Sequence, residues 1–159
     1  MNRNVVFGFG PQLVLDLHGC NPKKLKDEVF IRRLLNELPD HIQMTKIHDP
    51  HVIYYPGQED SFDKGGVSGF VLIAESHIAI HTFVDQGHAF VDIFSCKDFD
   101  MVKAEQYLVE QLEAKNVEKQ VFSRGREFPK EVKVVTPIIK NDRKAVEKHD
   151  FKRVLKESF

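Results

Sequence analysis

The feature that most constrains the fold is a run of apolar, partly β-branched residues in the middle of the chain, Val67–Ala74. Such a run is typical of a strand covered on both faces, or of a central strand in a tightly packed sheet. Two more strand candidates, Ile78–Phe83 and Ala89–Phe94, follow it and are joined by turn-forming residues at 85–87. The centre of the chain therefore predicts a group of neighbouring strands.

The flanking segments predict two helices and further strands. One helix is expected from Asn21 or Pro22 to about Leu38, with Asn21 as its cap and Pro39 as its stop. A second is expected over Phe99–Ala114. Other strands are expected at 12–17, 42–47, 52–55, 117–122 and 132–139, before a charged tail with helical potential from 142. We expect an α+β fold, a two-layer sandwich in which an antiparallel sheet carries helices on one face.

Length and composition limit the classes of protein. A chain of 159 residues, 42% hydrophobic and 30% charged, is typical of one globular domain, so residues 1–159 are expected to form a single domain. The net charge of −1 gives no basic excess for nucleic acid or an anionic membrane. No apolar run approaches the roughly 20 residues of a spanning helix. We expect a cytoplasmic protein with a small-molecule substrate and no nucleic-acid or membrane partner.

The cysteines and histidines raise the question of a metal site. In a reducing cytoplasm Cys20 and Cys96 are expected to be thiols, and Cys20 is interpreted as a structural thiol at a strand end. His77 and His81 are four residues apart, a spacing that brings ligands together on a helix, but this segment is predicted to be a strand. The chain also has no pair of cysteines at structural-zinc spacing, so no metal is predicted.

The residues around Ser76 pose a problem of strand geometry. In one unbroken strand from Ala74 to Phe83, Ser76 would face the opposite side from Glu75, His77, His81 and Phe83. Ser76 and His81 cannot act together in that arrangement. Either Ser76 is a buried strand serine, or the backbone is irregular near Glu75, a feature that tends to mark functional sites.

Several separate blocks of the sequence resemble one family. The blocks are Gly66–Gly69, Glu75–Phe83 and Val91–Cys96, together with Leu13–Asp16 followed by His18-Gly19-Cys20, and Arg124-Gly125. Their order and spacing, over about residues 7 to 126, resemble the bacterial and archaeal S-adenosylmethionine decarboxylase proenzymes. These are pyruvoyl-dependent enzymes of spermidine synthesis.

The resemblance implies self-processing at Glu75 and Ser76. The Ser76 hydroxyl attacks the Glu75 carbonyl, the amide becomes an ester, and β-elimination divides the chain into a β chain of residues 1–75 and an α chain of 76–159. Ser76 becomes the pyruvoyl cofactor, and Ser68 and His81 assist the processing. Such an attack needs an oxyanion donor and a base, which agrees with this assignment. Residues 128–159 are a longer C-terminal tail than compact relatives have.

The resemblance also implies the catalytic cycle and the substrate contacts. The pyruvoyl carbonyl forms a Schiff base with the substrate amine and accepts electrons as carbon dioxide leaves, and Cys96 returns a proton. Phe62 and Phe83 correspond to aromatic residues that sandwich adenine, although packing in the core is an equal alternative for both. Asp85, where a glutamate is common, is assigned to the substrate's polar groups.

The departures from the family pattern lie around the substrate pocket. Val84 replaces a usual proline, His88 replaces a common tyrosine, and Asp63-Lys64-Gly65 lacks the usual proline before Gly66–Gly69. A decarboxylase of arginine or ornithine on the same scaffold therefore remains an alternative. An unprocessed, non-catalytic paralogue is a second one, although the intact Ser68, Ser76, His81 and Cys96 argue against it. The family also implies a homodimer in which two sheets pack as an αββα arrangement.

Overall fold

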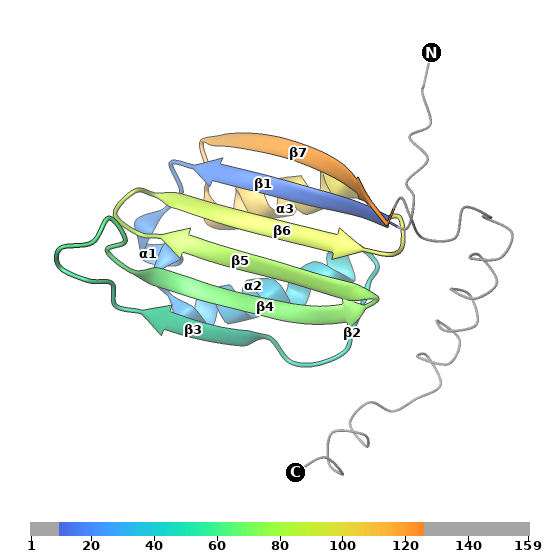
Figure 1. Ribbon diagram of the computed structural model, residues 1–159, viewed down its shortest axis with the longest axis horizontal. Coiled ribbons are helices and arrows are strands. Elements are labelled where there is room, and N and C mark those ends of the chain that lie inside the picture. The colour runs from blue at the N-terminus through green and yellow to red at the C-terminus, as the bar shows by residue number, and fades with distance from the viewer. Residues whose placement is uncertain (1–9, 126–159) are drawn as a thin grey trace, which may run out of the picture.

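The computed structural model describes residues 10–125, which form an antiparallel sheet with helices on one side (Figure 1). The order along the sheet is β2, β4, β5, β6, β1, β7, and β3 also pairs with β4. The strands are β1 (Gly10–His18), β2 (Thr45–Lys46), β3 (His51–Tyr55), β4 (Gly66–Ala74), β5 (Ser76–Phe83), β6 (His88–Ser95) and β7 (Asn116–Arg124). The helices are α1 (Pro22–Leu25), α2 (Glu28–His41) and α3 (Met101–Leu112). The antiparallel sheet is as expected.

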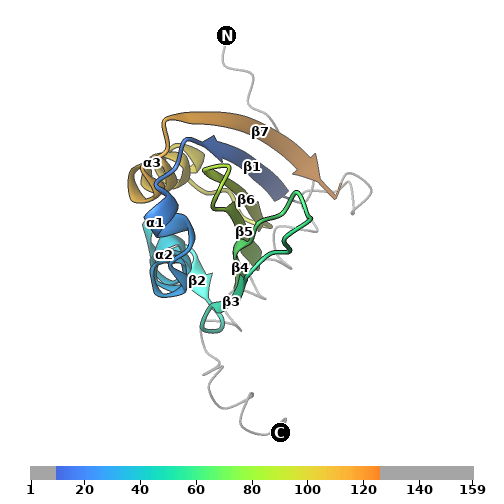
Figure 2. The same cartoon turned by 90° about the vertical axis from the view of Figure 1, so that its left-hand side faces the viewer.

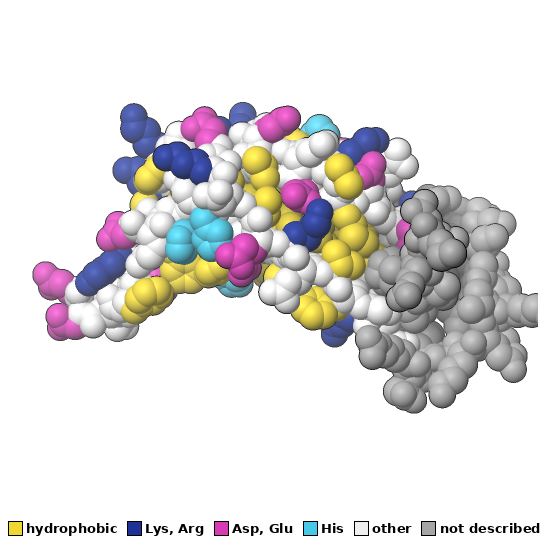
Figure 3. Space-filling view, turned by 90° about the horizontal axis from the view of Figure 1, so that it is seen from above, with side chains coloured by type: hydrophobic (Ala, Val, Ile, Leu, Met, Phe, Trp, Pro, Cys, Tyr) yellow, Lys and Arg dark blue, Asp and Glu magenta, His cyan; other side chains and the backbone are white. Residues whose placement is uncertain are grey.

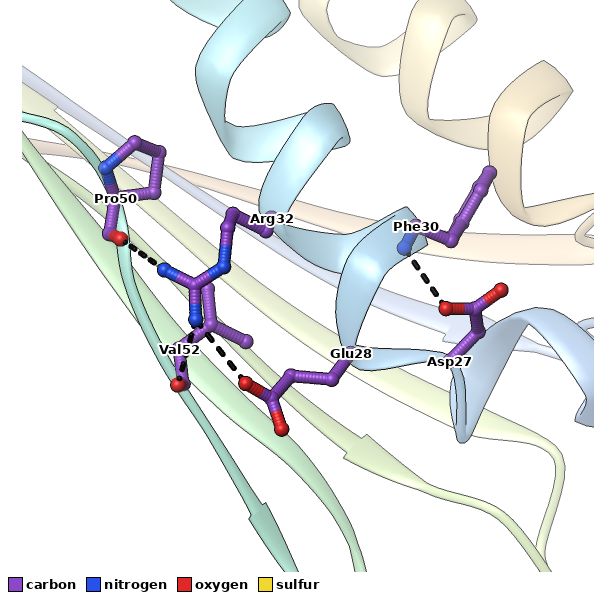
Figure 4. Close-up of polar contacts among 6 residues, drawn as sticks. All are labelled: Asp27, Glu28, Phe30, Arg32, Pro50 and Val52. Atoms are coloured by element: carbon purple, nitrogen blue, oxygen red, sulfur yellow. Dashed lines mark hydrogen bonds and ion pairs between the residues drawn. The ribbon is translucent and has the colours of Figure 1, made fainter.

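The predicted first helix is two helices, and this part of the prediction was wrong. Asn21 caps α1 by accepting a hydrogen bond from the Lys23 N–H, as predicted. The helix is then interrupted before Asp27. The Asp27 side chain accepts a hydrogen bond from the Phe30 N–H and caps the start of α2 (Figure 4). Because Asp27 is a good N-cap residue, a second helix begins there, within the segment whose apolar spacing predicted one helix. Pro39 lies inside α2, which ends at His41, so it does not stop the helix.

The helical layer is tied to the sheet by Arg32 of α2. Its guanidinium donates to the Pro50 carbonyl (2.7 Å) and to the Val52 carbonyl (3.2 Å), and it also pairs with Glu28 (3.1 Å) (Figure 4). The Val52 side chain is buried. Arg32 therefore holds α2 against β3 through hydrogen bonds to backbone carbonyls. Such bonds are strong because the donor is charged.

The hydrophobic core lies between the helices and one face of the sheet. It is built from alternate strand residues and from the inward sides of α2 and α3, including Leu13, Leu15, Val71, Ile73, Ile78, Ile80, Ile93, Ile31, Leu35 and Leu108. Figure 2 shows α1, α2 and α3 on the same side of the sheet, with the β3–β4 loop projecting to the other side. The opposite sheet face carries no helix of the described chain.

Of the two interpretations of Val67–Ala74, coverage on both faces does not hold within the described chain, whereas a central position in the sheet does, since β4 pairs with β5 and with β3. Burial alternates along β4, with Val71 and Ile73 buried while Phe70 and Leu72 are 45% and 44% exposed. The next strand, β5, alternates in the same way. We call the sheet side that carries Phe70, Leu72 and His81 the open face. Figure 3, which looks onto the β7 edge, shows hydrophobic side chains interspersed with charged ones.

The strand expected at 42–47 is shorter than predicted, and other expectations fall outside the described residues. The strand expected at 42–47 is reduced to Thr45–Lys46, because Ile42 caps the end of α2 and the following residues turn. The strand and helix expected beyond residue 131 lie outside the described residues. Within residues 10–125 no helix is long and apolar enough to cross a membrane.

Candidate active site

The backbone is irregular at Glu75–Ser76, which selects one of the two alternatives left open by the sequence. Strand β4 ends at Ala74 and β5 begins at Ser76, with Ile73 paired to Ser76 across the turn. Ser76 has a φ of 117°, a value that side chains other than glycine rarely adopt. Strain of this kind persists only where the surrounding structure imposes it, and it concentrates at functional sites.

The end of β6 supplies a donor to the Glu75 carbonyl. Ser76 is paired with Ser95, the last residue of β6, and the backbone N–H of the next residue, Cys96, points to the Glu75 oxygen at 3.4 Å. Cys96 is partly buried. The peptide that precedes Ser76 thus has its carbonyl directed at a backbone donor, the kind of group that stabilises an oxyanion. Cys96 is brought to the same turn.

A chain of polar side chains also begins at Ser76. The Nδ1 atom of His77 lies 3.5 Å from Ser76 Oγ, and its Nε2 atom lies 3.1 Å from Asp92 Oδ1. The other oxygen of Asp92 accepts a hydrogen bond from the side-chain amide of Gln12. The sequence analysis considered His77 only as a metal ligand and did not connect it with Ser76. The alternation of β5 could have indicated which face His77 occupies. Its contact with Asp92 could not be predicted, because the register that aligns Asp92 with Ala79 is a tertiary property.

Ser68 and His81 form a second pair, further along the same strands. They are directly opposite each other on β4 and β5, and Ser68 Oγ lies 2.9 Å from His81 Nδ1. Their side chains lie on the open face. His81 is five residues beyond Ser76 in β5, so the two Cα atoms are about 17 Å apart at the usual rise of a strand. The expected cooperation of His81 with Ser76 is therefore absent within one chain.

The three predicted substrate contacts lie still further from Ser76. Phe83 ends β5, about 23 Å from Ser76 by the same rise, and its ring packs edge-on against Phe90 at 5.3 Å. Phe62, in the β3–β4 loop, is 81% exposed. Asp85 is exposed in the β5–β6 turn. The loop and the turn adjoin, because the Gln86 side chain donates to the Phe62 carbonyl (3.1 Å).

The remaining candidate residues have other surroundings. Cys20 is buried, and this burial raises the pKa of its thiol to about 11. Near Ser76, the Arg124 guanidinium makes a cation–π contact with Phe94, 4.3 Å from the centroid of its ring. Across residues 10–125, no three His, Cys, Asp or Glu side chains are placed to hold a metal ion.

Comparisons with known proteins show the family to which the chain belongs. Residues 11–125 match the model of a decarboxylase family, described as S-adenosylmethionine decarboxylase. The chain is similar to the S-adenosylmethionine decarboxylase proenzyme of Aquifex aeolicus, with 37% identity over 117 residues that cover 73% of this chain and 81% of that protein. It is 42% identical to the proenzyme of Prochlorococcus marinus over 108 residues, which cover 67% and 81% of the two chains.

A solved structure extends the similarity to the fold. The crystal structure of the adenosylmethionine decarboxylase from Aquifex aeolicus aligns with a TM-score of 0.61 and 34% sequence identity, over 76% of this chain and 93% of that one. The match of the family model covers most of the chain and includes every residue of the two polar groups on β4, β5 and β6. The chain belongs to the S-adenosylmethionine decarboxylase family, and the resemblance found in the sequence is confirmed.

Proposed function

We propose that this protein is a self-processing, pyruvoyl-dependent enzyme that decarboxylates S-adenosylmethionine for spermidine synthesis. Membership of the family supports the reaction and the substrate. The observation that carries the self-processing is the placement of Ser76 in a strained turn, with the preceding carbonyl aimed at the Cys96 N–H. These are the features that a peptide bond needs before a neighbouring hydroxyl attacks it.

The cofactor forms from two residues of the chain itself, Glu75 and Ser76. Ser76 Oγ attacks the Glu75 carbonyl carbon, and the bond from that carbon to the Ser76 nitrogen breaks, which leaves an ester. A base then removes the Ser76 α-proton, and the Glu75 carboxylate leaves from the β-carbon. This elimination gives a dehydroalanine, an enamine that tautomerises to an imine, and water hydrolyses the imine to a pyruvoyl group with release of ammonia. The β chain then ends at Glu75, and the α chain carries the pyruvoyl group at its start.

The geometry around Ser76 fits this group. The Cys96 backbone N–H points to the carbonyl that precedes Ser76. Cys96 directly follows Ser95, the strand partner of Ser76. When formed, the pyruvoyl group supplies the electron sink that decarboxylation requires. We assign Cys96 as the proton donor to the substrate's α-carbon, because this residue lies at the same turn as Ser76 and a thiol can act as a general acid.

The separation of the two polar groups supports a dimeric active site. Neither Ser68 nor His81 reaches Ser76 across about 17 Å of strand within one chain. A second copy whose open face packs on the first in the antiparallel direction brings its Ser68 and His81 to the first chain's Ser76. The exposed Phe70 and Leu72 give such an interface apolar area. We therefore propose an αββα homodimer in which each chain completes the other's site.

The same packing assigns the substrate contacts. Phe83 and Asp85 of one chain, with Phe62 of the neighbouring loop, lie at the end of the open face away from their own Ser76. In the antiparallel dimer they face the other chain's Ser76. The two rings then hold the adenine, and the Asp85 carboxylate binds the ribose hydroxyls. A ring face also suits the sulfonium charge of the substrate.

Two measurements test the proposal. Denaturing electrophoresis and mass spectrometry of the purified protein should give fragments of 75 and 84 residues, with the larger one blocked to N-terminal sequencing. Release of carbon dioxide is then compared for S-adenosylmethionine, arginine, ornithine and lysine. Turnover of arginine or ornithine alone would favour the basic amino acid alternative and reject the roles of Phe62 and Phe83. An intact chain after long incubation would favour the non-catalytic paralogue.

A further inference from the structure

The polar chain from Ser76 through His77 and Asp92 to Gln12 has the arrangement of a nucleophile, a base and two groups that hold the base. Three of its members come from different strands: Gln12 from β1, His77 from β5 and Asp92 from β6. The His77 and Asp92 side chains are both partly buried on the open face. The Gln12 amide occupies the Asp92 oxygen that His77 does not contact.

The hydrogen bonds determine which nitrogen of His77 is free to accept a proton. Asp92 accepts a hydrogen bond from the Nε2–H of His77, because a carboxylate has no proton to donate. A neutral His77 in this tautomer has a lone pair on Nδ1, the atom that lies 3.5 Å from Ser76 Oγ. This distance is long for a hydrogen bond, as is common for catalytic pairs before the reacting groups tighten. The order of contacts is that of a serine, histidine and aspartate triad.

We propose that His77 is the general base of the first processing step, the shift of the Glu75 acyl group from nitrogen to oxygen. This inference rests on the proposed self-processing. Asp92 is a positioning residue that fixes the tautomer of His77, and Gln12 fixes Asp92. His81 is assigned to the later elimination, and in the proposed dimer it acts on the Ser76 of the other chain, since it lies about 17 Å from Ser76 in its own chain.

The step balances without any other reactant. His77 Nδ1 takes the proton of the Ser76 hydroxyl as Oγ forms its bond to the Glu75 carbonyl carbon, and the carbonyl oxygen takes the negative charge beside the Cys96 N–H. The carbon to nitrogen bond then breaks, and the imidazolium returns the proton to the Ser76 nitrogen. The products are an ester on Oγ and a free amine, with no change of oxidation state.

Hydroxylamine distinguishes this step from elimination, because it cleaves the ester but not the amide. His81→Ala blocks elimination, so its ester should accumulate and hydroxylamine should release a fragment that begins with Ser76. The double variant His77→Ala with His81→Ala should form the ester roughly 100-fold more slowly or not at all. His48→Ala with His81→Ala is the matched control, since His48 is an exposed loop histidine. Equal yields of ester from the double variant and from His81→Ala would overturn the proposal.

Two readouts separate a base from a structural residue. Added imidazole should restore at least a tenth of the wild-type cleavage rate to His77→Ala, and failure of every small base to restore it would count against the role. Asp92→Asn should slow cleavage of the otherwise wild-type chain about tenfold but should not slow the imidazole-rescued His77→Ala chain, because free imidazole needs no positioning. Equal slowing in both backgrounds would make Asp92 merely structural. A wild type that stays intact overturns the self-processing itself, and this is seen before any variant is compared.

Discussion

The two ends of β5 carry different parts of the same chemistry. At its start, Ser76, Glu75, Cys96 and His77 meet around one strained peptide. Towards its other end, His81 is bonded to Ser68, and Phe83 packs on Phe90. The first region has the serine of the proposed cleavage site and an oxyanion donor, while the second has a histidine and serine pair and aromatic surface, about 17 Å or more from that serine along the strand. This difference supports the proposed dimer, in which the two regions of one chain are half-sites that belong to different active sites.

Mixing two inactive chains gives the largest expected effect. Ser76→Ala keeps the second half-site and His81→Ala keeps the first, so each alone should remain intact or nearly so. When the two are co-expressed with tags of different mass, only the His81→Ala chain should be cut, because the other chain lends it His81. Mass spectrometry identifies which chain is cleaved.

A matched partner controls this experiment. The chain with both Ser76→Ala and His81→Ala should not restore cleavage to His81→Ala. Rapid cleavage of His81→Ala alone, or no cleavage in the mixture, would contradict the division of the site between two chains.

Placing a charge on the open face should separate the half-sites. Phe70→Asp puts a carboxylate at an exposed apolar position of β4, and burial of an unpaired charge in an interface is costly. We expect the dimer dissociation constant to rise roughly 100-fold, measured by sedimentation, with slower self-cleavage. Val29→Asp, at a 78% exposed position of the helical layer, should leave both properties unchanged. An equal loss in the two variants would mean that the open face is not the interface.

A substitution in the second region alone should weaken substrate binding more than processing. Phe83→Ala removes a ring from the proposed adenine site, and we expect KM for S-adenosylmethionine to rise about tenfold, while self-cleavage proceeds. Phe122→Ala, which removes an exposed ring of β7, is the comparison. Steady-state kinetics gives KM for both variants, and denaturing electrophoresis follows their self-cleavage. If KM is unaffected by Phe83→Ala, then Phe83 is a packing residue, which was the alternative interpretation of the sequence.

The last expected effect is on stability and not on activity, and it concerns the buried thiol at the second end, where the Cys20 N–H donates to the Gly87 carbonyl (2.9 Å). Its pKa is raised from 9.0 to about 11 by burial, so the folded state keeps a proton that the unfolded state loses. Stability should therefore fall between pH 9 and 11, by on the order of 2 kcal/mol for this group. Cys20→Ala should lose less stability than wild type between pH 8 and pH 11, measured by urea unfolding. An equal loss would show that other groups determine the alkaline behaviour.

The elements whose pattern is local were predicted well from the sequence. β1, β5, β6 and α3 have clear periodicity and caps, such as the Asp100 side chain that accepts from the Lys103 N–H at the start of α3. The errors fall where a local signal is overridden. The Asp27 cap divides a continuous helical pattern, and Pro39 is tolerated inside α2. Such choices depend on packing against the sheet, which the sequence pattern does not contain.

The sequence by itself determined the candidate residues, the order of the motifs and the family, because these depend only on residue identity and spacing. It also limited the possibilities at Glu75–Ser76 to two, since strand alternation is a local property. The tertiary structure alone decided which residues meet. Antiparallel pairing brings Cys96 to the Glu75 carbonyl and Asp92 to His77, and it keeps His81 far from Ser76, because register fixes contacts between segments that are distant along the chain.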